Sequence, residues 1–168
     1  MPSRAHSGGS RKSKAMELFL RGDEDWNRGR LRSALKLFRA AAKAGDTGAL
    51  LNMGYFYENG LGVRQNTATA LDWYKRAYRR GDASAANNIG TIWRDRQKPQ
   101  RALTWFRRAT AMGNDSSNLE IAKCYLQFKN DPRRAIVFLK RVCKSNKVSE
   151  AEQDAAQRLL KQAEKLRR

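Results

Sequence analysis

The chain has 168 residues, of which 35 are Lys or Arg and 16 are Asp or Glu, so its formal net charge is +19. Hydrophobic residues make up 40% of the sequence, which allows a packed core, yet no apolar run is long enough to span a bilayer. Excess positive charge attracts polyanions, so the composition allows nucleic acid, an anionic membrane surface or an acidic protein as partners.

The N-terminal stretch MPSRAHSGGSRKSK is basic and rich in serine. It lacks the apolar segment of a secretory signal. We expect residues 1–14 to form a disordered basic tail, and an Arg- and Ser-rich transit peptide is the alternative.

From residue 15 onward the sequence is repetitive. The pattern Ala-apolar-x-apolar-aromatic begins at Ala34, Ala70, Ala102 and, with a final leucine, Ala135, at intervals of 36, 32 and 33 residues. A small residue precedes each alanine by 12 to 16 positions: Gly22, Gly54, Gly90 and Ala122. Small residues at one register let helices approach closely, although a glycine in an isolated helix costs about 1 kcal/mol relative to alanine. Each repeat is therefore predicted to be a helix pair, with the small residue on the first helix and the alanine pattern on the second.

Glycines and aspartates mark the predicted helix boundaries. A glycine adopts the left-handed conformation that ends a helix, and a following aspartate can cap the next one. These pairs are Gly45-Asp46, Gly81-Asp82 and Gly113 with Asp115. Asp131-Pro132 predicts another helix start, and capping boxes are predicted at Ser117–Glu120 and Ser149–Glu152. The last box opens a final helix whose apolar stripe consists of Ala155, Ala156, Leu159, Leu160, Ala163 and Leu166.

The second repeat has a longer connection between its helices, over residues 58–66. Gly60 and Gly62 in this insertion are predicted to occupy turn positions. A phosphate-binding loop would need a preceding strand and a GK[ST] ending, and the sequence has neither.

The second repeat also carries the most specific motif. It reads Ala49-Leu50-x-x-Met53-Gly54-x-x-Tyr57, Gly60-Leu61-Gly62-Val63, Ala70-Leu71-x-Trp73-Tyr74-x-x-Ala77 and Gly81-Asp82. This motif resembles the Sel-one-like subfamily of tetratricopeptide repeats, and the other repeats resemble the shorter tetratricopeptide pattern. The likeness extends roughly from Met16 to Asn146 and departs from the pattern at Ala122 and Val142.

The resemblance implies an all-α fold. We expect an α-solenoid of about four antiparallel helix pairs over residues 15–147, followed by a C-terminal capping helix over residues 148–168. In such families the first helices line a concave groove that binds peptides or proteins, and the second helices form the convex back. The resemblance names no partner and gives no reaction type.

The expected groove residues lie on the first helices. They are Asn52, Tyr55, Asn87, Asn88, Thr91, Arg94 and Lys123. Asn52 and Asn88 occupy equivalent positions and could hold a peptide backbone through their amides, or could instead bond a neighbouring helix. Tyr57, Trp93 and Tyr125 are predicted to fill the core between helices.

Basic residues recur on the second helices and are predicted to form a stripe. Its members are Lys75, Arg76, Arg79, Arg80, Arg107, Arg108, Arg133, Arg134, Lys140 and Arg141. A solvated face is the alternative to an anion-binding role. Trp73 and Trp105 lie beside these charges, but their register predicts packing positions, which weakens the case for base stacking.

Catalytic chemistry has little support in the sequence. The single histidine, His6, lies in the tail, and Cys124 and Cys143 are too far apart for a Cys-x-x-Cys metal motif. We expect both cysteines to be small buried hydrophobes in a reducing cytosol, or a disulfide if the protein is exported. No cofactor and no metal are expected.

The sequence thus favours a non-catalytic cytoplasmic adaptor or scaffold. Its predicted partner is an acidic peptide or protein, bound through the groove and the basic surface. The alternative is a solenoid that binds RNA or DNA through its basic stripe and tail, and a third possibility is a subunit of a larger assembly.

Overall fold

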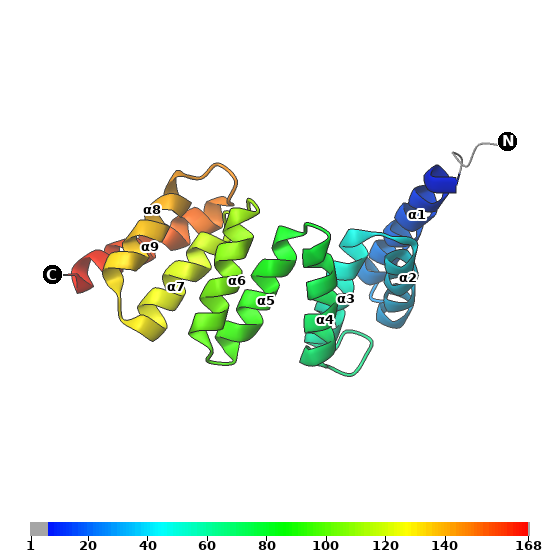
Figure 1. The fold of residues 1–168 in the computed structure, drawn as a ribbon, viewed down its shortest axis with the longest axis horizontal. Coiled ribbons are helices and arrows are strands. Elements are labelled where there is room, and N and C mark those ends of the chain that lie inside the picture. The colour runs from blue at the N-terminus through cyan, green and yellow to red at the C-terminus, as the bar shows by residue number, and fades with distance from the viewer. Residues whose placement is uncertain (1–6, 168) are drawn as a thin grey trace. The chain divides into compact units, whose positions relative to one another are not determined.

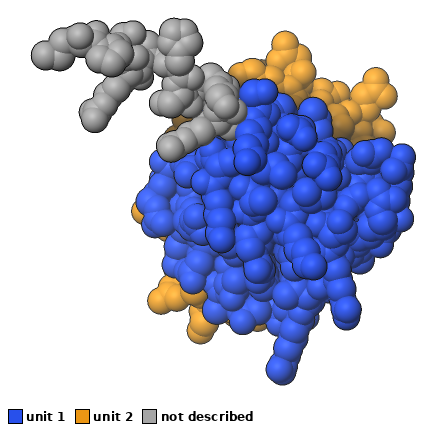
Figure 2. Space-filling view, turned by 90° about the vertical axis from the view of Figure 1, so that its right-hand side faces the viewer, with its two compact units in different colours: residues 1–82 blue, residues 83–168 orange. Residues whose placement is uncertain are grey.

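The computed structural model describes the backbone of residues 7–167 and the side chains of residues 12–167. Within that range the chain forms nine α-helices and no strand (Figure 1). The helices follow one another as antiparallel pairs joined by short turns, so the predicted all-α solenoid class is confirmed. They belong to two compact units, residues 1–82 and residues 83–168 (Figure 2).

Unit 1 contains the first two helix pairs. Its helices are α1 (Ser7–Asn27), α2 (Leu31–Ala44), α3 (Thr47–Asn59) and α4 (Thr67–Arg79). The apolar residues of α2 recur at helical spacing, from Ala34 and Leu35 to Phe38, Ala41 and Ala42, and all five are buried. The ring of Phe38 packs edge-on against Phe56 of α3, with ring centroids 5.4 Å apart. One apolar stripe on each helix therefore joins the two pairs into a common core.

The N-terminal boundary differs from the expectation. Helix α1 begins at Ser7, so residues 7–14, predicted to be part of a disordered tail, are helical. Residues 1–6, which include His6, lie outside the described residues.

Unit 2 contains the third and fourth pairs and a final helix. Its helices are α5 (Ala83–Asp95), α6 (Pro99–Ala111), α7 (Ser117–Lys129), α8 (Pro132–Lys144) and α9 (Glu150–Leu166). Phe106, Ile121, Leu139 and Val142 are fully buried in its core. Helix α9 packs against α8 and α7 and buries Ala156 and Ala163 of its predicted stripe, so a helix does follow the fourth pair.

The small residues of the first helices face aromatic rings of the second helices. A Cβ atom added to Gly90 would lie 2.6 Å from ring carbons of Phe106, and one added to Gly22 would lie 2.9 Å from the ring of Phe38. A Cβ atom added to Gly54 would lie closer still to the ring of Tyr74. Real Cβ atoms do not approach carbon so closely, because dense packing leaves no overlap between atoms. The glycines are therefore required by interhelical contact.

The fourth pair solves the same packing problem with different residues. Ala122 replaces the glycine, and Leu139 replaces the aromatic residue of the second helix. Both side chains are fully buried in the core of unit 2. A smaller side chain on α8 leaves room for one methyl group on α7, which accounts for the departure of Ala122 from the repeat pattern.

Several predicted helix boundaries are confirmed. Asp46 caps α3 by accepting a hydrogen bond from the Ala49 N–H at 2.7 Å, and Asp131 caps α8 in the same way. Both hydrogen bonds of the Ser149–Glu152 capping box are present at the start of α9. The glycines Gly45, Gly81 and Gly113 all have positive φ angles, as expected of residues that end helices.

The predicted capping box at Ser117–Glu120 is wrong. Ser117 is fully buried inside α7, and its N–H donates to Oδ1 of Asn114, so Asn114 supplies the polar side chain at this helix start. Asp115, the expected cap, instead accepts a hydrogen bond from the Ser145 hydroxyl at 2.6 Å. Asp115 therefore contacts a segment that is distant in sequence.

The inserted connection between α3 and α4 is a turn, as predicted. Gly60 ends α3 with a φ of 70°, and the Asn66 side chain caps α4 by accepting from the Thr69 N–H at 3.0 Å. A Cβ atom on Gly62 would lie 2.8 Å from the Leu31 carbonyl carbon, so this glycine lets the loop lie against the start of α2.

The two cysteines are unpaired. Cys124 is buried in the core of unit 2, and burial raises the pKa of its thiol to about 11; Cys143 is half-buried. None of the helices in the described part of the chain is long and apolar enough to cross a bilayer.

Candidate functional site

A pocket of about 420 Å³ lies on unit 2, among α5, α7 and α9. It is lined by Arg94, Lys123, Leu126, Gln127, Leu159, Gln162 and Leu166. Two of the predicted groove residues, Arg94 and Lys123, are thus brought together from successive first helices. Helix α9 supplies the opposite wall of the pocket. The sequence predicted only a capping role for this helix.

Helical spacing explains how the pocket is assembled. On α7, Glu120, Lys123 and Gln127 follow one another at intervals of three and four residues, which places them on one side of the helix. On α9, Leu159, Gln162 and Leu166 have the same spacing. Helices α7 and α9 therefore both contribute polar and apolar side chains to the lining of the pocket.

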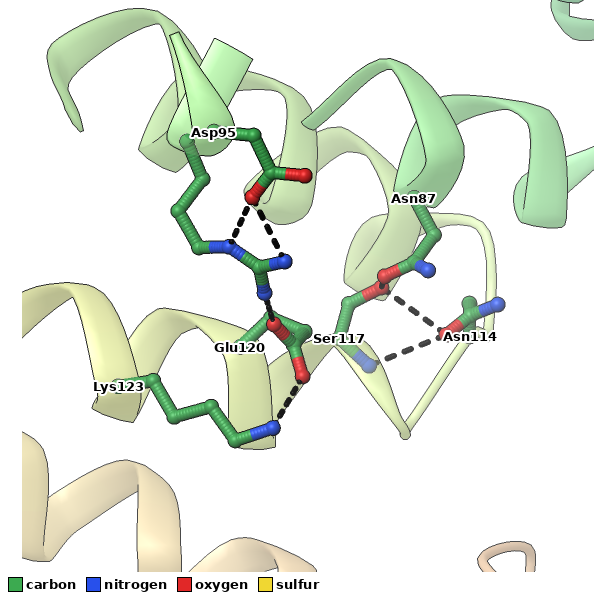
Figure 3. Close-up of polar contacts among 7 residues, drawn as sticks. Asn87, Asp95, Asn114, Ser117, Glu120 and Lys123 are labelled. Atoms are coloured by element: carbon green, nitrogen blue, oxygen red, sulfur yellow. Dashed lines mark hydrogen bonds and ion pairs between the residues drawn. The ribbon is translucent and has the colours of Figure 1, made fainter. Parts of the chain in front are cut away.

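The cationic end of the pocket is organised by Glu120. Arg94 forms an ion pair with Glu120, and the Lys123 Nζ atom lies 2.7 Å from the other oxygen of the same carboxylate (Figure 3). Arg94 also pairs with Asp95 at 2.9 Å. The Glu120 side chain is only 17% exposed and does not line the pocket, so it holds the two cations from behind.

The apolar end of the pocket is formed by three leucines. Leu126 and Leu159 are half-buried, and Leu166 is 60% exposed. The amide groups of Gln127 and Gln162 lie on the same lining and provide both donors and acceptors. The pocket can therefore accept an apolar side chain, bond a peptide backbone and meet a carboxylate.

A buried polar contact joins the third and fourth pairs beside the pocket. The Ser117 Oγ atom lies 2.8 Å from Oδ1 of Asn87 and 2.9 Å from Oδ1 of Asn114 (Figure 3). Asn87, predicted to contact a ligand, is thus already used to bond the next helix. The sequence left open whether Asn52 and Asn88 bond a neighbouring helix. In the structure Asn87, the residue before Asn88, makes such a bond.

The other predicted groove residues remain separate from this pocket. Asn88 and Thr91 are half-buried on α5, and within residues 12–167 the Asn52 and Asn88 side chains have no hydrogen-bond partner. In unit 1, Tyr55 is 41% exposed, and its ring contacts Trp26 at a centroid distance of 5.6 Å. These residues are accessible, and their binding role stays a prediction.

All members of the predicted basic stripe are exposed. Lys75, Arg76 and Arg79 lie on α4, with Arg80 directly after it; Arg107 and Arg108 lie on α6; Arg133, Arg134, Lys140 and Arg141 lie on α8. Their shared placement on second helices was predictable from the repeat.

The packing prediction for Trp73 and Trp105 needs correction. Their neighbours Tyr74 and Phe106 are fully buried, but the two tryptophans are only half-buried. An arginine three residues later covers each indole: Arg76 lies 4.1 Å from the Trp73 ring centroid, and Arg108 lies 4.5 Å from that of Trp105. The repeat register predicts where each indole lies along its helix, but it does not predict that an arginine covers the ring.

The successive helix pairs and their glycine–aromatic contacts define a helical-repeat protein. The Sel1 repeat model matches residues 25–46, 47–82 and 83–114, so the chain belongs to the Sel1 repeat family. The match includes the first and third pairs, for which the sequence had suggested only the shorter tetratricopeptide pattern.

Solved structures share this fold. A Sel1 repeat protein from Oxalobacter formigenes has a TM-score of 0.65 and 23% identity, covering 92% of this chain and 72% of that one. A protective antigen of uropathogenic Escherichia coli with an SLR fold has a TM-score of 0.69 and 18% identity, covering 90% and 38%. A tetratricopeptide repeat protein from Parabacteroides merdae has a TM-score of 0.67 and 16% identity, covering 91% and 61%.

Repeat proteins of this kind generally mediate protein–protein interactions, and their fold is typically a non-catalytic scaffold. The family therefore gives the general role, whereas the partner depends on the surface residues of this particular chain.

Proposed function

We propose that the protein is a non-catalytic adaptor whose unit 2 pocket binds a peptide segment of an acidic protein partner. The observation that carries this proposal is the pocket among α5, α7 and α9, with cations at one end and leucines at the other. Its ligand would place a large apolar side chain among Leu126, Leu159 and Leu166 and a neighbouring carboxylate near Arg94 and Lys123.

The hydrogen-bond inventory supports a carboxylate at the cationic end. An arginine has five N–H donors and a lysine has three. Asp95 and Glu120 engage Nε, Nη1 and Nη2 of Arg94, and Glu120 engages Lys123 once, so donors remain on both cations. The four side chains together are formally neutral. The pocket would therefore select its ligand through directed hydrogen bonds and apolar contacts rather than through net charge. Long-range attraction of an acidic partner would come from cations elsewhere on the protein.

The proposal is tested with fluorescently labelled peptides of equal length that contain either Leu-Glu or Leu-Lys. We expect the full chain to bind the Leu-Glu peptide more tightly. Lys123→Gln and Leu166→Ser should each weaken binding about tenfold, because each removes one side of the recognition. Both positions are exposed enough that melting should stay near that of the unchanged protein.

Val137→Ser is the matched control. Val137 is 50% exposed on α8 and does not line the pocket, so its replacement removes a comparable apolar surface elsewhere. Equal affinity for both peptides, or equal loss in the control, would show that the pocket is not the binding site. A companion variant, Asn52→Ala with Asn88→Ala, tests whether the remaining groove residues contribute.

A further inference from the structure

Positive charge in this protein is segregated by helix. The second helices carry Arg32, Lys36, Arg39 and Lys43 on α2; Lys75, Arg76 and Arg79 on α4; Arg101, Arg107 and Arg108 on α6; and Arg133, Arg134, Lys140, Arg141 and Lys144 on α8. Asp72 is their only acidic residue. By contrast, α3 carries Glu58 and no cation, and α5 balances Arg94 with Asp95. In each unit the second helices are therefore strongly basic and almost free of acids, and none of them lines the pocket.

In unit 2 these cations gather around aromatic rings. The Arg107 Nη2 atom donates a hydrogen bond to the Tyr125 hydroxyl at 2.7 Å. The Tyr125 ring stacks on Phe138, with centroids 5.8 Å apart and an interplanar angle of 19°. Arg141 lies over the Phe138 ring at 5.0 Å, and Arg134 lies 5.8 Å from the Tyr125 centroid. Arginines of α6 and α8 thus surround a pair of rings, one from α7 and one from α8.

Arg108 follows Arg107 on α6, and its guanidinium lies over a third ring, Trp105, 4.5 Å from the ring centroid. We call Arg107, Arg108, Arg134 and Arg141 the arginine cluster. All four are exposed, and within residues 12–167 the only ion pair of the cluster joins Arg134 to Asp131 at 3.4 Å. An arginine supported by a ring has lost conformational freedom but keeps free donors at its edge.

Unit 1 shows the same contacts at equivalent repeat positions. The Arg39 Nη2 atom donates to the Tyr57 hydroxyl at 2.9 Å, and Arg76 lies over the Trp73 ring at 4.1 Å. A contact that recurs in separate repeats arises from the repeat register, so the arrangement in unit 2 is not an isolated side-chain placement.

We infer that the arginine cluster of unit 2 binds the phosphate backbone of a nucleic acid. Planar guanidinium groups bind phosphate through two parallel hydrogen bonds, and a surface almost free of acids suits a uniformly negative polymer. The Tyr125 ring is buried, and the rings of Phe138 and Trp105 are half-buried beneath arginine, so these rings are not available to stack bases. The contact should therefore be independent of base sequence.

An acidic protein fits this surface less well than nucleic acid does. Arginine is common in protein interfaces, but these interfaces also need exposed apolar and aromatic side chains to anchor their centre. On α6 and α8, within the described residues, Val137 is the only large hydrophobic side chain that is exposed. The inference does not depend on the pocket, because the cluster shares no residue with the pocket lining.

The test measures anisotropy of the full chain with labelled duplex DNA and single-stranded RNA of unrelated sequences, over a range of salt concentrations. We expect binding that is insensitive to sequence and that falls steeply with salt, since each phosphate contact contributes about −0.9 to the log–log slope for a duplex and about −0.7 for a single strand. The triple variant Arg107→Gln, Arg108→Gln, Arg141→Gln should weaken binding at least about tenfold and make the duplex slope shallower by about 3.

The control removes the same charge from another helix of unit 2. Arg158, Lys161 and Lys165 are exposed on α9, and their replacement by glutamine should change affinity much less. Circular dichroism melting checks that both variants stay folded. Equal loss in both variants would mean that only net charge matters and would overturn the inference. Absence of nucleic-acid binding at physiological salt, with binding to poly-glutamate retained, would overturn it in favour of an acidic protein partner.

Discussion

The third and fourth helix pairs of unit 2 pack the same two positions with different residues. The third pair places Gly90 against the Phe106 ring, whereas the fourth pairs Ala122 with Leu139. A methyl group gained on the first helix is matched by the smaller side chain on the second. The two pairs thus fill this part of the core with different residues of similar combined volume, as dense packing requires.

The third and fourth pairs also contribute unequally to the lining of the pocket. The Sel1 match ends at residue 114, and the pocket is lined mainly by residues of α7 and α9, beyond that point. The repeat pattern describes buried contacts, whereas the candidate site lies at positions that the pattern leaves free.

The largest expected effect comes from filling the glycine position of the third pair. Gly90→Leu should lower the free energy of unfolding by about 3 kcal/mol, because a Cβ atom alone would already lie 2.6 Å from Phe106. Urea denaturation followed by circular dichroism measures the change. Ser84→Leu adds the same side chain at an exposed position of α5 and should have little effect. Similar losses in the two variants would contradict the packing account.

The next effect comes from giving the fourth pair the ring of the third. Leu139→Phe should cost about 2 kcal/mol, since Ala122 occupies the space that a glycine leaves open in the other pairs. Adding Ala122→Gly should recover part of this loss. The coupling energy of the double-mutant cycle is the decisive quantity, and we expect about 1 kcal/mol or more. Additive effects would show that the two positions do not share volume.

A smaller effect is expected from the reverse exchange. Gly90→Ala gains up to about 1 kcal/mol in helix propensity but meets the Phe106 ring, so we expect a net loss of about 1 kcal/mol. Phe106→Leu should relieve the clash and make Gly90→Ala favourable in that background. If Gly90→Ala stabilises the unchanged protein, the ring is more mobile than this contact implies.

The smallest effect concerns Cys124, which stands in the fourth pair where the third has Ile92. Burial raises the pKa of the Cys124 thiol from 9.0 to about 11. Between these values the folded thiol keeps a proton that the unfolded chain has lost, so stability should fall as the pH rises through this window. At pH 10 the unchanged protein should lose about 1 kcal/mol more, relative to pH 8, than Cys124→Val. Parallel pH profiles for the two proteins would exclude a titrating buried thiol.

The sequence by itself determined the features that rest on local or periodic interactions. Repeat spacing indicated the helix pairs, and the caps at Asp46, Asp131 and Ser149 depend only on atoms three residues away. Because second helices have one exposed side, the recurrence of arginine on them also predicted which residues would be exposed.

Only the tertiary structure decided the contacts between successive repeats. Ser117 fits a capping box in sequence, yet it is buried against Asn87, and Glu120 organises Arg94 from the neighbouring pair. The hydrogen bond from Arg107 to Tyr125 likewise joins two pairs. Such partners lie 18 to 30 residues apart, and a single sequence carries no signal for which side chains meet at that separation. The physical reason is that side-chain packing between helices, rather than chain spacing, brings these groups together.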